Sequence, residues 1–245
     1  MNKEDKLLPL SMQITRRVLA EIQTGIYRNI DRLPPEIEIA SLLGVSRTVV
    51  RDALSTLERE GFISRKHGKG TSINRHVLEV KTRIDLEKEF ISMVKEAGFA
   101  PTVKVWSLQQ IRADAVLAGW LDLEEGAEVI SVDRVVYADG IPTIYCIDTI
   151  DQRLVQNKDY CFEDLQKPIF DFLRNYCGVE VYMDLTEMHA VNADDNLAKI
   201  LDVPTGTALL HLNERGYSYE GRLVLYSSEY YREGILKHTI LRKKI

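Results

Sequence analysis

The chain has 245 residues, of which 45% are hydrophobic and 28% are charged, and its formal net charge is -5. This length allows two modest domains, and the composition is that of a globular protein with neither a long apolar run nor an apolar N-terminal signal segment. We therefore expect a cytoplasmic protein without a membrane partner.

The basic residues are concentrated at the N-terminal end. Residues 1–76 carry 13 Lys and Arg against 9 Asp and Glu, whereas residues 77–245 carry 19 against 28. A basic module joined to an acidic one suits a protein in which only the first part approaches phosphates. The three cysteines and five histidines show no metal-ligand spacing, so we expect no disulfide framework, metal site or other cofactor.

Three helices are predicted in the basic module. Apolar residues at Ile14, Val18 and Ile22 have helical spacing. Two prolines suited to a first turn open a second helix that runs to about residue 43. A glycine separates it from a third helix over residues 47–60, which has one apolar stripe. The stripe consists of Val50, Ala53, Leu54 and Leu57.

Two short runs at residues 62–65 and 71–74 flank a basic, glycine-rich segment at 66–70. They predict a β-hairpin wing behind a helix-turn-helix, which places the third helix in a DNA major groove. Arginines at the start of that helix are suited to guanine edges, whereas hydroxyls and wing amides fix position on phosphates. The predicted DNA-binding residues are Glu36, Ser46, Arg47, Thr48, Arg51, Lys66, His67, Gly68, Lys69 and Gly70.

The module resembles the GntR family of bacterial transcription regulators. The matching motifs are Leu33-Pro34 followed by Glu36, the run at 43–48, Val50-Arg51, Glu60-Gly61 and Gly68-x-Gly70. The resemblance implies that the start of the third helix meets the DNA and that the wing tip lies at the neighbouring minor groove. Ile37 stands where the family usually has a phosphate-contacting Arg, and Val49 replaces a common Thr. We therefore expect a shifted operator preference and a weaker salt dependence.

The segment after the wing is predicted to connect two domains. Residues 75–86 alternate in polarity and contain neither Gly nor Pro, which favours an extended strand. The predicted organisation is a winged helix-turn-helix at 1–76, a linker at 77–86 and an effector-binding and dimerisation domain at 87–245.

The larger domain contains an internal repeat. Residues 113–126 recur as 193–206 with identical residues at seven positions, which are Ala113, Asp114, Leu117, Ala118, Leu121, Asp122 and Gly126. Each copy predicts an Asp-capped helix followed by a β-hairpin, with turns at Asp139-Gly140 and Glu220-Gly221. Two such halves form an α+β domain with a pseudo-symmetric antiparallel sheet.

This region resembles the UTRA effector-binding domain of the HutC branch of GntR regulators, which has a chorismate-lyase-like fold. The resemblance rests on the helix-hairpin pattern, on Arg134 with the segment 138–142, and on residues 230–232. Many relatives hold a sugar phosphate with Ser or Thr side chains and two arginines. Here the corresponding positions are Glu89 and Ile91, Arg134 and Val136, and Pro168, so most of that anion-binding group is missing.

Two further positions that often carry a sugar-recognising Glu hold Cys146 and Leu225. We therefore hypothesise a ligand that is neutral or cationic, such as a nucleoside or an amine-bearing metabolite, and not a sugar phosphate. Tyr145 and Asp148 are three residues apart on a strand, so they share a pocket only if a bulge lies between them. The predicted effector contacts are Glu89, Arg134, Tyr145, Asp148, Tyr226, Glu229 and Tyr231.

Together these features predict a transcription repressor that binds operator DNA under the control of a small molecule. One recognition helix covers one half-site, which predicts a homodimer on a palindrome. One alternative is an enzyme of chorismate-lyase-like fold fused to a DNA-binding module, although the sequence shows no catalytic constellation. Another is an architectural DNA-binding protein, for which a large acidic domain is unnecessary.

Overall fold

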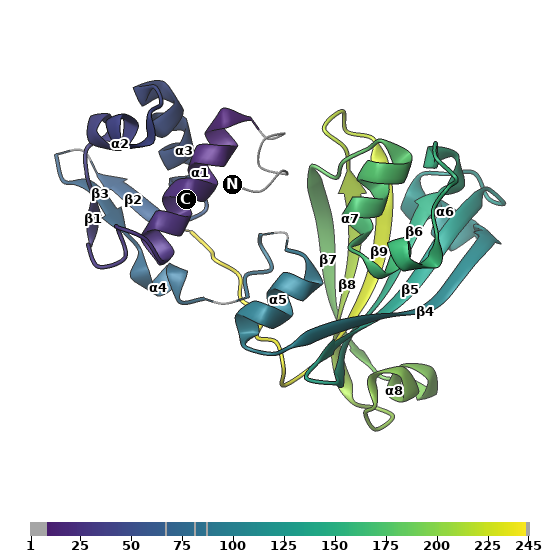
Figure 1. Cartoon of the computed structure of the whole chain (residues 1–245). Helices are drawn as coiled ribbons and strands as arrows, with labels where there is room; N and C mark the ends of the chain where they lie inside the picture. The colour runs from purple at the N-terminus through teal and green to yellow at the C-terminus, as the bar shows by residue number, and fades with distance from the viewer. Residues whose placement is uncertain (1–8, 67, 81, 87, 244–245) are drawn as a thin grey trace. The chain divides into compact units, whose positions relative to one another are not determined.

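The computed structural model describes residues 9–66, 68–80, 82–86 and 88–243 (Figure 1). The chain forms two compact units, one of residues 1–81 with 241–245 and one of residues 82–240. The chain therefore passes between the units twice, whereas the sequence suggested one linker at 77–86 and assigned the whole C-terminal part to the second domain.

The first unit is a three-helix bundle with a small sheet. Its elements are α1 (Leu10–Gln23), β1 (Arg32–Leu33), α2 (Glu36–Leu43), α3 (Arg47–Arg59), β2 (Ile63–Lys66), β3 (Gly70–Ile73) and α4 (Arg75–Leu78). Both predicted apolar stripes are buried, the one on α1 and the one on α3. Gly44 ends α2 with a φ of 68°, a left-handed conformation that glycine adopts without strain. The predicted helix-turn-helix is confirmed.

The wing strands β2 and β3 pair in antiparallel register, with Ile63 opposite Ile73. Strand β1 adds to the free edge of β3, which gives the strand order β1-β3-β2. The sequence did not indicate β1, because two residues are too short for an alternating pattern.

The expected extended strand at 75–86 is wrong: α4 forms at its start, and the β-structure of the described residues that follow is limited to an isolated bridge between Arg83 and Thr239. The guanidinium of Arg75 donates to the carbonyl oxygens of Tyr27, at 2.8 Å, and Ile22, at 3.2 Å. Val77 is buried in the same unit. These contacts with residues about 50 positions away in sequence fix the segment to the first unit, and polarity alternation carries no information about them.

The second unit is built on one antiparallel sheet of six strands, in the order β4-β5-β6-β9-β8-β7. Its strands are β4 (Pro101–Arg112), β5 (Glu128–Ala138), β6 (Ile141–Asp151), β7 (Met183–Asn192), β8 (Ala208–Tyr217) and β9 (Leu223–Arg232). Its α-helices are α5 (Phe90–Ala97), α6 (Ala115–Leu121), α7 (Ile169–Phe172) and α8 (Asp195–Leu201). A π-helical turn, Leu173–Cys177, continues α7, and 3-10 turns lie at Gln152–Leu154 and Phe162–Gln166.

The predicted repeat is confirmed. The Asp114 and Asp194 side chains each accept the backbone N–H three residues ahead at 2.8 Å. The helices end in the same way, because Asp122 and Asp202 have φ values of 53° and 51°. Each half also includes the strand before its helix, β4 or β7, which the sequence comparison did not reveal. The halves meet where β6 pairs with β9.

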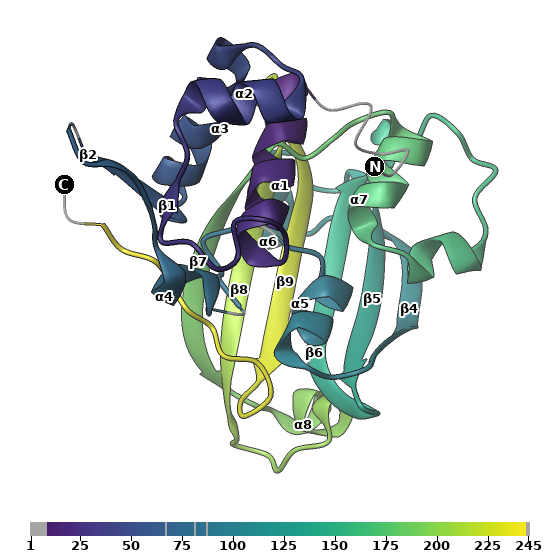
Figure 2. The same ribbon diagram turned by 60° about the vertical axis from the view of Figure 1, so that its left-hand side comes forward.

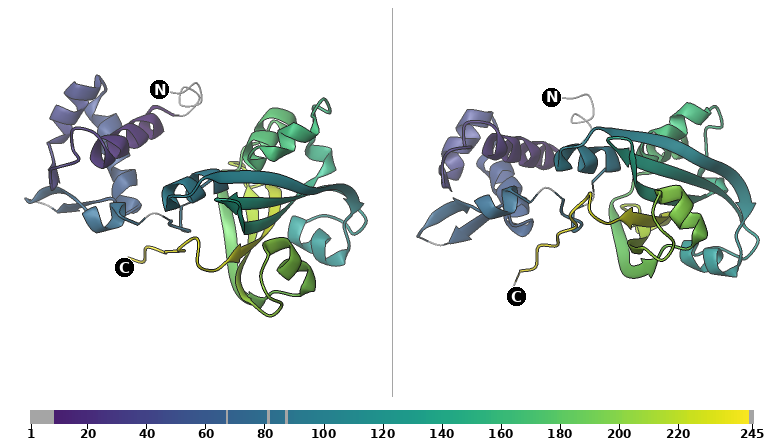
Figure 3. Two further views of the ribbon diagram at one scale, coloured as in Figure 1. Left: turned by 60° about the horizontal axis from the view of Figure 1, so that its bottom comes forward. Right: turned by 90° about the horizontal axis from the view of Figure 1, so that it is seen from below.

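The two faces of the sheet are covered by different helices (Figures 2 and 3). On one face, α8 packs around Tyr145 and Leu209, and α6 packs around Val129 and Tyr226. On the other face, α5 and α7 pack in two separate apolar clusters. Buried polar side chains, among them Arg134 and Asp148, lie on this same face together with lining residues from both helices.

Candidate DNA interface and ligand cavity

The N-terminal end of α3 presents two arginines that share one carboxylate. The Nε of Arg47 donates to Oε2 of Glu36 at 2.9 Å, and the Nε of Arg51 lies 3.5 Å from the same oxygen. The arginine side chains are 62% and 54% exposed. The hydrogen bond from Arg47, followed by the charges of both arginines, lowers the pKa of Glu36. Glu36 therefore orients two exposed cations.

Two other predicted DNA-binding residues, Ser46 and Thr48, lie at the start of α3. The Ser46 hydroxyl accepts the backbone N–H of Val49 at 3.3 Å and caps the helix. Thr48 is exposed beside the arginines. Both residues therefore lie at the start of the third helix, where the sequence places them.

The wing tip is exposed at Lys66, Gly68, Lys69 and Gly70. Gly68 and Gly70 have φ values of 74° and 78°, so the tip has a backbone that favours glycine. A turn bond from Lys69 N to Lys66 O, 2.9 Å long, closes the tip. His67, which the sequence also assigns to DNA binding, lies outside the described residues.

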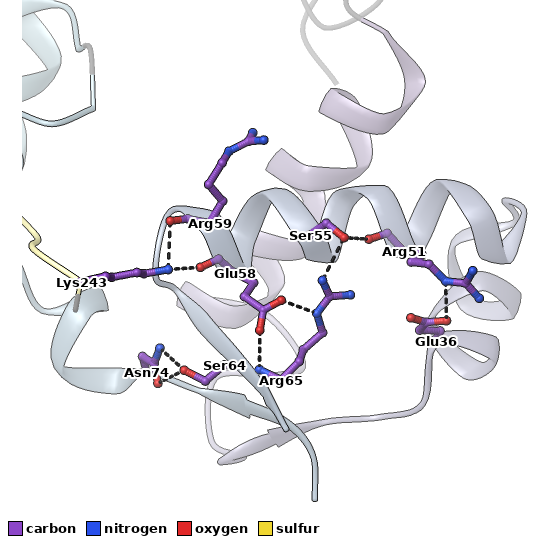
Figure 4. A network of polar contacts seen from close by, with 9 residues as sticks. All are labelled: Glu36, Arg51, Ser55, Glu58, Arg59, Ser64, Arg65, Asn74 and Lys243. Atoms are coloured by element: carbon purple, nitrogen blue, oxygen red, sulfur yellow. Dashed lines mark hydrogen bonds and ion pairs between the residues drawn. The ribbon is translucent and has the colours of Figure 1, made fainter. Parts of the chain in front are cut away.

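A polar network joins the recognition helix to the wing (Figure 4). The Arg65 side chain donates to Glu58 Oε2 at 2.7 Å and to the Ser55 hydroxyl at 2.9 Å. Ser55 in turn donates to the carbonyl of Arg51 at 2.8 Å. These bonds set the wing strand relative to the helix that carries the exposed arginines. No local pattern in the sequence predicts these bonds, because the partners become neighbours only when the hairpin folds back.

The C-terminal segment of the chain completes the same unit. The ammonium group of Lys243 donates to the carbonyls of Glu58 and Arg59, the latter at 3.0 Å (Figure 4). These carbonyls lie at the C-terminal end of α3, where the helix dipole is negative and a cation is stabilising. Gly61 leaves room for Leu241, since a Cβ there would lie 2.2 Å from the Leu241 Cδ2 atom. Sequence analysis assigned this segment to the other domain.

The second unit contains a cavity of about 360 Å³, a volume that includes the space at its mouth. Its floor is a set of side chains that the strand register places on one face of β5, β6, β9, β8 and β7. Its walls come from the starts of α5 and α7. The lining residues are Lys88, Glu89, Phe90, Arg134, Asp148, Pro168, Ile169, Phe170, Asp184, Glu214, Leu225, Ser227 and Glu229.

A buried ion pair lies at the centre of this floor. Arg134 and Asp148 bind each other through Nη2 and Oδ2, and their side chains are 4% and 2% exposed. The second Nη of Arg134 donates to the carbonyl of Lys167 at 2.7 Å, and the hydroxyl of Ser227 donates to Asp148 at 2.6 Å. Charged groups this far from water require such partners. The pair is therefore a fixed part of the cavity.

Three other carboxylates line the cavity with weaker compensation. Burial, followed by the charge of Asp171, raises the pKa of Glu89 to about 7. Burial raises the pKa of Glu214 to about 7, although Thr186 donates to Glu214 at 3.0 Å. Burial alone raises the pKa of Asp184 to about 6. Desolvation favours the protonated form of all three groups.

Of the predicted effector contacts, the structure brings four together in this cavity, namely Glu89, Arg134, Asp148 and Glu229. Tyr231 lies on the same face, where its hydroxyl donates to Glu229. It lines a second, larger hollow of about 740 Å³ together with His238.

The sequence also predicts Tyr145 and Tyr226 as effector contacts, and the structure corrects this prediction, because both side chains lie outside the cavity on the other face of the sheet. Tyr145 donates to Asp133 at 2.8 Å and packs with α8, whereas Tyr226 donates to Asn213 at 2.9 Å and stacks on Trp120 of α6. Strand β6 pairs with β5 in continuous register across Tyr145 and Asp148. No bulge interrupts that stretch, so the two side chains lie on opposite faces.

Sequence analysis missed Lys88, Asp184, Glu214 and Ser227 as lining residues. Glu214 did carry a signal, because it aligns with Asp133 in the repeat. The repeat does not show, however, that β8 turns Glu214 toward the cavity while β5 turns Asp133 the other way. Asp184 lies on β7, a strand that was not predicted.

Comparisons with known proteins agree with this two-part structure. The model of the UTRA domain matches residues 96–234, and that of bacterial regulatory proteins of the gntR family matches residues 10–73. The HTH-type transcriptional repressor NagR of Bacillus subtilis (strain 168) is 25% identical over 232 residues, which cover 95% of this chain and 93% of NagR.

Solved structures resemble the chain over almost its whole length. The structure of the possible transcriptional regulator YydK from Bacillus subtilis subsp. subtilis str. 168 has a TM-score of 0.78 at 19% identity, and the match covers 96% of this chain and 100% of that one. PhnF from Mycobacterium smegmatis has a TM-score of 0.60 at 21% identity, with 94% and 99% covered. At these identities the likeness establishes the fold.

In the part of the chain that the structure describes, no helix has the length and apolarity needed to cross a bilayer.

Proposed function

The chain belongs to the UTRA-domain regulators of the GntR family, and from this premise we propose that it is a repressor that binds a palindromic operator as a homodimer. It is a transcription regulator with a helix-turn-helix DNA-binding domain and a UTRA effector-binding domain. We assign it to the HutC branch and place its action in the cytoplasm, because that is where bacterial operators lie.

The observation that carries the proposal is the exposed start of α3. Arg47 and Arg51 are held by Glu36 but remain more than half exposed, so their guanidinium groups are available to base edges. Arginine forms a bidentate pair with guanine in the major groove. The network around Arg65 presents the wing from the same unit, so we propose that Lys66, Lys69 and the wing glycines contact the backbone beside the groove.

The dimer follows from the size of one DNA-binding unit. A single recognition helix and its wing read one half-site, and two copies related by symmetry read two half-sites about one helical turn apart. The departures at Ile37 and Val49 are both in or next to the reading surface, and Ile37 is 66% exposed. We therefore keep the expectation of an operator and a salt dependence that differ from those of relatives.

We assign the cavity of the second unit a binding role and not a catalytic one. Its central arginine is neutralised by a buried carboxylate, an arrangement suited to positioning a ligand. A ligand that binds there is proposed to change operator affinity by about 1 to 3 kcal/mol, the usual range of coupling between two sites.

The experiment is the selection of binding sites from random double-stranded DNA by the full chain, followed by sedimentation of the free protein and of its complex. The expected result is a palindrome bound by two copies of the chain. Selection of no sequence above random DNA, or a single copy on the selected site, would refute the proposed function.

A further inference from the structure

The charge inside the cavity is predominantly negative. Two cationic residues line it, and both are ion-paired, Lys88 with Glu96 and Arg134 with Asp148. The carboxylates that line it are Glu89, Asp148, Asp184, Glu214 and Glu229. Like charges close together and away from water oppose folding. Such a group of carboxylates is therefore suited to binding a ligand that neutralises their charge.

The carboxylates lie at defined positions on neighbouring strands. Asp184 is opposite Gly216, and Glu214 is opposite both Thr186 and Ser227. A Cβ atom at position 216 would lie 3.0 Å from Oδ1 of Asp184, so the glycine leaves that carboxylate room above the sheet. Asp184 and Glu214 therefore present acceptors side by side at the same part of the cavity floor.

Arg134 contributes a second and independent feature. Both of its terminal nitrogens are bonded, one to Asp148 and one to the carbonyl of Lys167. Its Nε has no hydrogen-bond partner, even though the side chain is only 4% exposed and water therefore cannot serve as one. The residue lines the cavity. A buried donor without an acceptor costs free energy. Arg134, which lines the cavity, thus has one unused N–H.

We propose that this cavity binds a small organic cation, a ligand with a protonated amine or amidine group for Asp184, Glu214 and Glu89 and one neutral hydrogen-bond acceptor for the Arg134 Nε. The inference rests on the proposed function in taking the cavity as the effector site. It commits to a ligand class opposite in charge to a sugar phosphate.

Other occupants fit these residues less well. An anion would meet the carboxylates, while the two lining cations are already matched, Arg134 by Asp148 and Lys88 by Glu96. A metal ion needs several ligands in a tight shell, and no group of three His, Cys, Asp or Glu side chains within the described ranges is placed to hold one. An organic ammonium ion requires only hydrogen-bond acceptors of opposite charge.

Proton release gives the proposal a further signature. The pKa values of Glu89 and Glu214, both raised to about 7, imply that these groups are partly protonated near neutral pH. A cation binds to the ionised forms, so its affinity rises with pH and its binding releases protons. The charged or titratable groups near them are Lys88, Arg134, Cys146, Asp148, Asp171, Arg174, Asp184, Glu229 and Tyr231.

The test uses three probes of one length that differ in charge, namely 4-aminobutan-1-ol, 1,4-butanediol and 4-hydroxybutanoate. Each is titrated into the full chain by calorimetry, up to about 50 mM at constant ionic strength, at pH 5.5 and pH 8. Fragments of this size are expected to bind weakly, in the millimolar range. The variants are Glu214→Gln and Asp184→Asn, with Glu125→Gln as the control because Glu125 is exposed and does not line the cavity.

The expected result is a preference of at least tenfold for the amine over the other two probes at pH 8 and a loss of at least tenfold at pH 5.5. Either cavity variant weakens amine binding at least fivefold, and the control does not. Equal binding of the three probes, a preference for the acid, or no binding of any probe at 50 mM overturns the proposal.

The selection of DNA sites is measured separately on the same preparation. A protein that selects an operator but prefers 4-hydroxybutanoate refutes only the ligand class. A protein that binds the amine but selects no DNA refutes the regulatory function and leaves the cavity chemistry standing.

Discussion

The molecule contains two arginine–carboxylate clusters of similar composition and opposite burial. In the first unit, Glu36 binds Arg47 and Arg51 with both guanidinium groups more than half exposed. In the second, Arg134 and Asp148 are almost completely buried. An exposed pair contributes little to stability and exchanges partners readily, whereas a buried one cannot lose a partner without leaving a bare charge. The same chemistry is therefore suited to an exchange of partners in one place and to a fixed framework in the other.

The comparison is tested most strongly by removing one partner of the buried pair. Asp148→Asn leaves the Arg134 charge uncompensated and is expected to lower the free energy of unfolding by about 3 to 5 kcal/mol, as measured by urea denaturation. Glu125→Gln, on an exposed carboxylate, should change it by less than about 0.5 kcal/mol. A loss below about 1 kcal/mol for Asp148→Asn would mean that water reaches the pair.

A second difference concerns pH. The pKa of Glu214 is raised to about 7 from 4.5, so the folded state binds more protons than the unfolded chain between these values. The free energy of unfolding should therefore fall as the pH rises from about 4.5 to 7 and then level off, with about 1 to 3 kcal/mol from this group.

Urea denaturation at a series of pH values measures this slope. Glu214→Gln should flatten it, and Glu125→Gln should leave it unchanged. A slope that persists in full in Glu214→Gln would assign the proton uptake to Glu89 or Asp184.

On the exposed side, Arg47→Ala should cost about 1 to 3 kcal/mol of operator affinity and relax sequence preference, because a base contact is lost. Its effect on unfolding should stay below about 1 kcal/mol. Lys69→Ala is the matched wing variant and should weaken operator and random DNA alike, lowering the salt slope by about 1. Fluorescence anisotropy at several salt concentrations measures both. Identical behaviour of the two variants would contradict their separate roles.

The smallest effect is expected for Glu36→Gln. The change removes the charge that Arg47 and Arg51 share and should alter the unfolding free energy by no more than about 1 kcal/mol. Binding to random DNA should strengthen, because one negative charge near the phosphates is gone, while discrimination between operator and random DNA should decline. If discrimination improves instead, Glu36 does not orient the arginines.

Features that depend on residues close together in sequence were predicted, and features that depend on residues far apart in sequence were not. The α3 stripe of Val50, Ala53, Leu54 and Leu57 is a local pattern, and so is the Asp cap repeated at Asp114 and Asp194. Both were predicted correctly. The helix at Arg75 was not, because its guanidinium binds carbonyls about 50 residues away.

In the cavity, the sequence identified four lining residues but could not assign faces; the four are Glu89, Arg134, Asp148 and Glu229. Tyr145 and Tyr226 turn to the opposite side of the sheet, since side-chain direction follows from strand register and not from position in a repeat. Asp184 required knowledge of β7, whose partner β8 is set by long-range pairing.

The segment Leu241–Lys243 has a practical meaning for anyone who recombines regulators of this kind. Because its residues complete the unit that carries α3, that unit is discontinuous in the gene. A chimera that exchanges only residues 1–81 would pair a transplanted DNA-binding unit with a foreign C-terminal segment, and any side chain at the position of Gly61 would collide with Leu241. Successful exchange should require residues 1–81 and the segment Leu241–Lys243 to come from the same parent.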